Sequence, residues 1–128
     1  MLIAEELDEL WDEVRANHYG LARAEAAQVG ALAIRFAVDL YGGPSSRREH
    51  CHTVLTEQRA LRSSVGPAGR RCASSHESFG FLRREFEALW SAVIHFDEAR
   101  SPAIRMSTAA VRFIAETPAM PQHAAVGQ

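Results

Sequence analysis

The densest group of potential metal ligands in this sequence is Glu49-His50-Cys51-His52. Glu49 and His52 are three residues apart, and on a helix this spacing aims a carboxylate and an imidazole at one point, as in di-iron helical bundles. Those bundles need a second Glu-x-x-His pair on another helix, and this chain has none. Ser46 and Glu49 also fit a capping box, which gives Glu49 a purely structural role. The sequence leaves both interpretations open, with His18 as a further ligand of the metal site.

Nucleophilic chemistry has one candidate, Cys72, because it directly follows Arg70 and Arg71. Cations beside a thiol stabilise its reactive thiolate form. The second cysteine, Cys51, lies on an apolar helix face and is expected to pack. No Gly-x-Ser-x-Gly elbow occurs, and all 14 basic residues are arginine, so lysine-dependent chemistry is absent. These features favour a protein that is not an enzyme, and no pattern specifies a cofactor.

The charges are segregated along the chain, although the net charge is only −2. Residues 1–46 carry eight acids and three arginines, whereas residues 47–73 carry six arginines and two acids. The basic segment could bind an anionic ligand or nucleic acid. It could equally lie against the acidic helix, within or between subunits. The arginines proposed for anion binding are Arg47, Arg48, Arg70 and Arg71.

The elements that must position these residues begin with an apparently unbroken helical pattern over residues 2–41. Such a helix would be about 60 Å long, whereas a compact domain of this size is about 36 Å across. We therefore predict an acidic amphipathic arm over residues 2–18 and a central, buried helix over residues 19–41. Asn17-His18-Tyr19-Gly20 is the one plausible break, with Gly20 as a possible C-cap glycine, and we expect the helix to continue through it, straight or kinked.

Three further helices are predicted over residues 46–63, 74–97 and 101–116 by apolar spacing and by capping serines. Together they give an all-α fold, a small bundle of about four helices in a single domain of residues 1–116. Residues 117–128 are expected to form a disordered tail. No run approaches 18 consecutive apolar residues, so we expect no membrane span.

The arm suggests the function that the sequence favours most. One face of the arm carries a narrow apolar stripe of four residues, which are Leu7, Leu10, Trp11 and Val14. A helix that projects from its own domain needs a partner to cover such a stripe. We therefore predict a cytoplasmic, non-catalytic interaction or regulatory subunit that forms a homodimer or binds a partner's helix. The alternatives are a metal- or small-ligand-binding bundle and a regulator that binds nucleic acid or another anionic ligand.

Overall fold

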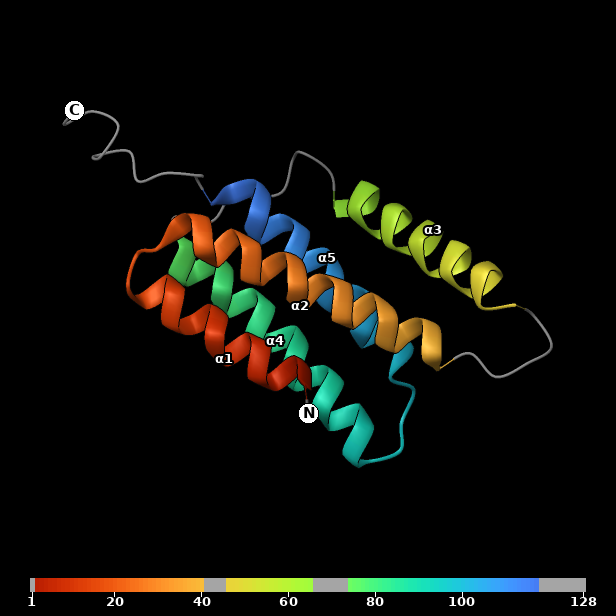
Figure 1. The fold of residues 1–128 in the computed structure, drawn as a ribbon. Coiled ribbons are helices and arrows are strands. Elements are labelled where there is room, and N and C mark those ends of the chain that lie inside the picture. The colour runs from red at the N-terminus through yellow and green to blue at the C-terminus, as the bar shows by residue number, and fades with distance from the viewer. Residues whose placement is uncertain (1, 41–45, 66–73, 118–128) are drawn as a thin grey trace.

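The computed structural model describes residues 2–40, 46–65 and 74–117, and all regular secondary structure in these ranges is helical (Figure 1). The predicted all-α class is therefore confirmed. The helices are α1 (Leu2–Arg15), α2 (Tyr19–Asp39), α3 (Arg47–Val65), α4 (Ser75–Ile94) and α5 (Arg100–Glu116). No helix in the described ranges is long and apolar enough to cross a membrane.

The predicted long first helix is two helices, α1 and α2, which fold back on each other. The expected continuity was wrong, and the break lies within the predicted Asn17–Gly20 segment, at Asn17, which has a left-handed φ of 59°, rather than at the glycine. The amide of His18 donates to the Glu13 carbonyl and that of Asn17 to the Val14 carbonyl, the two bonds of a Schellman motif. Asparagine tolerates this conformation well. The reversal removes the length problem, because each helix fits within the domain.

Four of the helices form the main bundle, as two hairpins packed against each other. Helices α1 and α2 form the first hairpin and α4 and α5 the second, with α2 against α5 and α1 against α4. The contact of α2 with α5 is close because its buried face consists mostly of small residues. A Cβ added at Gly30 would lie 3.1 Å from the Cβ of Ala110. The buried face of α2 comprises Ala22, Ala26, Val29, Gly30, Ala33, Ala37 and Val38.

Helix α3 lies outside this bundle, packed on α2 and α5 (Figure 1). Val54 and Gln58 are its buried anchors, and the amide of Gln58 donates to the hydroxyl of Ser107 on α5 at 3.1 Å. An ion pair between Glu57 and Arg100 adds a polar link to the same neighbour. Among the described residues α3 makes no contact with α4. A strip of α5 between α3 and α4 is therefore left uncovered.

Capping hydrogen bonds fix the starts of α3, α4 and α5. Ser46 and Ser74 accept hydrogen bonds from the amides of Glu49 and Glu77, so the serine half of both predicted capping boxes is present. Helix α5 begins one residue before the predicted Ser101, whose amide is instead capped by the Glu98 carboxylate.

The other end of α5 is held by a side chain from α2. The guanidinium of Arg23 donates to the carbonyls of Ile114 and Thr117, at 2.5 and 2.7 Å. These carbonyls lie at a helix end, where the intrahelical donors run out. Arg23 thus supplies donors that the helix itself lacks.

Candidate functional site

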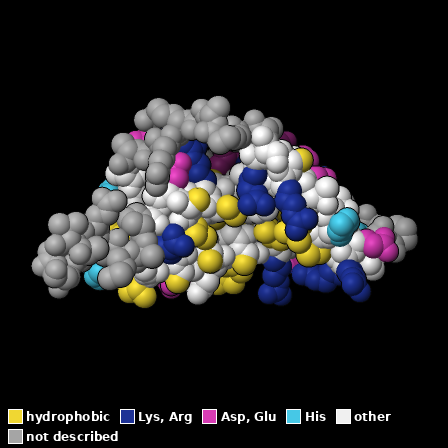
Figure 2. Space-filling view, turned by 90° about the horizontal axis from the view of Figure 1, so that it is seen from above, with side chains coloured by type: hydrophobic (Ala, Val, Ile, Leu, Met, Phe, Trp, Pro, Cys, Tyr) yellow, Lys and Arg dark blue, Asp and Glu magenta, His cyan; other side chains and the backbone are white. Residues whose placement is uncertain are grey.

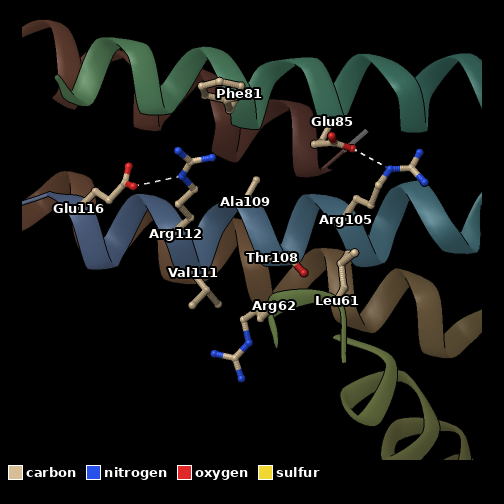
Figure 3. Close-up of a pocket in the computed structure, with 10 residues that line it drawn as sticks. All are labelled: Leu61, Arg62, Phe81, Glu85, Arg105, Thr108, Ala109, Val111, Arg112 and Glu116. Carbon is tan, nitrogen blue, oxygen red and sulfur yellow. Dashed lines mark hydrogen bonds and ion pairs between the residues drawn. The ribbon is translucent and has the colours of Figure 1, made fainter. Parts of the chain in front are cut away.

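The uncovered strip of α5 is the floor of a groove of about 340 Å³. Leu61 and Arg62 enter it from the last turns of α3, while Phe81 and Glu85 enter it from α4 (Figure 3). The remaining lining residues come from α5 and are Arg105, Thr108, Ala109, Val111, Arg112 and Glu116. A groove of this size lies at the lower end of the range for small-ligand sites. It can hold one or two large side chains.

The groove combines an apolar floor with a frame of arginines. Arg105 pairs with Glu85 at 3.0 Å and Arg112 with Glu116 at 3.1 Å, which fixes both guanidinium groups along the groove (Figure 3). Arg112 also lies over the ring of Phe81, 5.0 Å from its centroid, in a cation–π contact. Seen from above, the side of the molecule with α5 and α3 shows apolar side chains bordered by arginines (Figure 2).

Arg62 differs from the two other arginines of the groove. It is exposed, and it forms no hydrogen bond or ion pair with any residue in the described part of the chain. The groove thus has an apolar floor, two arginines paired with carboxylates, and a third arginine without a partner among the described residues. This arrangement was not predicted from the sequence, because its residues come from three helices. The only signal was the excess of arginine in residues 47–73.

The predicted partner-binding stripe lies inside the chain's own core. Leu7 is 5% exposed, and Leu10 and Val14 are fully buried between α1 and its neighbours. Trp11 is half-buried, with its ring 5.0 Å from that of Phe79 on α4. The inference of a projecting arm was therefore wrong. The stripe is covered within the chain, because α1 folds back against α2 and α4.

The proposed metal ligands are not brought together. His18 lies in the turn between α1 and α2, where its ring is 2.8 Å from the Glu13 carboxylate. Glu49 and His52 lie in the first turns of α3, at the other end of the bundle from that turn (Figure 1). His18 therefore cannot complete a site with them. Within the described ranges, three carboxylates do meet elsewhere, those of Glu6, Glu9 and Glu25.

This carboxylate cluster joins α1 and α2, with one oxygen of each residue within 4.8 Å of the others. The pKa of Glu25 is raised from 4.5 to about 7. The largest cause is its partial burial, and the hydrogen bonds and negative charges of Glu6 and then Glu9 add to it. One oxygen of Glu25 and one of Glu6 are buried without a hydrogen-bond partner. The cluster is thus a local source of repulsion between the two helices.

The basic residues predicted to bind anions are separated. Arg47 forms an ion pair with Asp39 at the end of α2, and Arg48 is exposed on the first turn of α3. The ion pair between Arg47 and Asp39 agrees with the other interpretation of the charge segregation, in which the basic segment lies against the acidic one within the chain. Arg70, Arg71 and Cys72 fall outside the described residues.

Comparisons with known proteins assign no function. Neither a protein-family model, nor a curated protein, nor a solved structure matches this chain. The groove and its charges are therefore the basis of the functional argument.

Proposed function

We propose that this protein is a non-catalytic interaction or regulatory subunit, and that its groove between α3, α4 and α5 binds an apolar group bordered by carboxylates. The observation that carries the proposal is Arg62, which has no partner among the described residues and lies at the edge of an apolar floor, beside two arginines held in place by Glu85 and Glu116. An aromatic or aliphatic side chain would bury its body against Phe81 and Ala109. A neighbouring carboxylate would then pair with Arg62.

The proposal keeps the class of function predicted from the sequence and moves the binding surface. The stripe of Leu7, Leu10 and Val14 is already covered, whereas the groove is open to a ligand. The cytoplasmic location and the homodimer stay predictions from the sequence.

A pair of small ligands tests the charge requirement. We expect 3-phenylpropionate, an apolar ring with a carboxylate, to shift the backbone amide resonances of residues 108–112 in two-dimensional NMR spectra. 3-Phenylpropylamine, of similar shape and opposite charge, should bind at least fivefold more weakly, because the three arginines of the groove outnumber its two glutamates and leave it with a positive charge.

Two variants localise the ligand. Arg62→Glu should weaken binding of the carboxylate about fivefold, and Ala109→Trp should abolish it by filling the groove. Arg48→Glu is the matched control, because Arg48 is exposed on the same helix at the far end from the groove. Equal binding of acid and amine, or unchanged binding in Ala109→Trp, would contradict the proposal.

A further inference from the structure

The turn between α4 and α5 holds an aromatic residue in an unfavourable position. Phe96 is 97% exposed and has a left-handed φ of 55°. Its amide donates to the Val93 carbonyl and that of Asp97 to the Ala92 carbonyl, which is again a Schellman motif. Asn17 occupies the equivalent position in the first hairpin. A bulky side chain in this conformation is a genuine outlier, whereas Asn or Gly adopts it readily.

Phe96 also extends an apolar surface at this end of α4. Trp90 and Ile94 are four residues apart on one face of the helix, and they are 44% and 49% exposed. Asp97 and Glu98 follow Phe96 directly, and both are exposed. Asp97 forms no hydrogen bond or ion pair through its side chain with any residue that the structure describes. The corner therefore presents an apolar ring with a free carboxylate beside it, and its backbone is fixed by two hydrogen bonds.

We propose that the Phe96–Asp97 corner of one copy of this chain docks into the groove between α3, α4 and α5 of a second copy. This inference rests on the proposed function, because it identifies the occupant of the same groove. The ring of Phe96 would pack on Phe81 and Ala109, and the carboxylate of Asp97 would pair with Arg62. The match is one of size and charge. A groove of about 340 Å³ accepts an aromatic side chain, and each partner supplies a charge opposite to one that has no partner among the other's described residues.

A chain cannot fill its own groove. Phe81 in the groove lies 13 residues before Ile94, the last residue of α4, which corresponds to about 20 Å along the helix, and Phe96 lies beyond that end. The groove lies along the second half of α5, while the corner precedes the start of α5 (Figure 1). The contact is therefore head-to-tail between copies. Such a contact uses two different surfaces, so it closes as a reciprocal two-fold dimer or a ring, or it continues as an open chain.

Two complementary variants test this arrangement. Phe96→Asn removes the ring and keeps the turn, and Ala109→Trp blocks the groove and keeps the corner. In sedimentation velocity between 10 µM and 1 mM, we expect the wild type to grow in mass with concentration and both variants to stay monomeric. A mixture of the two variants should form a 1:1 heterodimer, because one still has its groove and the other its corner.

The controls separate this inference from the proposed function. Circular dichroism should show that both variants remain folded, and Phe96→Asn should still bind 3-phenylpropionate. A wild type that is monomeric at 1 mM would overturn the inference, and so would a mixture of variants that stays monomeric. If Phe96→Asn still binds the carboxylate in either case, the groove keeps its proposed function with another occupant. Loss of self-association by Asp97→Arg, restored by mixing with Arg62→Glu, would support the predicted ion pair.

Discussion

Replacing Glu25 by glutamine should stabilise the protein at alkaline pH and leave its stability near pH 4.5 almost unchanged. The pKa of Glu25 is about 7 in the folded protein, against 4.5 for an unperturbed glutamate. Between these values the folded state binds more protons than the unfolded state, so stability falls as pH rises. The full shift corresponds to about 3.4 kcal/mol at roughly 1.36 kcal/mol per pKa unit. Because the carboxylates are only partly buried, solvent screening reduces this to about 1 kcal/mol.

Urea denaturation of the wild type and Glu25→Gln at pH 4.5, 6 and 8 measures this difference. The difference in unfolding free energy should rise from near zero at pH 4.5 to about 1 kcal/mol at pH 8. Glu5→Gln is the matched control, because Glu5 is exposed on α1, the helix that carries Glu6 and Glu9, and lies outside the cluster. A difference for Glu25→Gln that does not change with pH would refute the assignment of repulsion to this cluster.

Three further substitutions probe the helix ends and the docking of α3. Arg23→Ala should lower the unfolding free energy by about 2 kcal/mol because two carbonyls of α5 lose a charged donor, whereas exposed Arg35→Ala should cost under about 0.5 kcal/mol. Gln58→Ala should cost about 2 kcal/mol, because it leaves a cavity and removes the donor to the buried Ser107 oxygen, while Ser107 still donates to the Ile104 carbonyl. It should also speed amide hydrogen exchange in α3 more than in α1. Phe96→Asn should raise the unfolding free energy by about 1 kcal/mol, because Phe96 has a left-handed backbone and its ring is almost wholly exposed in the monomer. A destabilised variant would show that the ring contributes to the fold.

The sequence predicted the helical class because the apolar spacing and the capping serines are local signals. Ser46 and Ser74 cap helices α3 and α4 where their spacing to Glu49 and Glu77 predicted. The segment Asn17–Gly20 was predicted as the one plausible break, but a continuous helix was favoured because the residues that follow it are good helix formers, and an Asn in a left-handed conformation leaves no distinctive pattern. Gly20, the more obvious breaker, lies inside α2. Whether the chain reverses at Asn17 depends on the packing of α1 against α2 and α4.

That single error determined the prediction of the interaction surface. An apolar stripe on a projecting helix and the same stripe on a folded-back helix have identical sequences. The burial of Leu10 and Val14 therefore could not be assigned to the chain itself or to a partner. The groove was hidden for a different reason. It exists because α3 reaches α5 without touching α4, and no local pattern encodes the gap between two helices.

The two hairpin turns provide an internal comparison that bears on function. Both end a helix with the same pair of hydrogen bonds, and both place one residue at a φ near 60°. The first turn uses Asn17, which suits that conformation. The second uses Phe96, whose ring is almost wholly exposed and so gains no packing in the monomer in return for the strain. Arg62, in the last turns of α3, is likewise without a partner among the described residues. One contact between copies would bury the ring and pair the charge, which is why we place the interaction at these two sites rather than on α1.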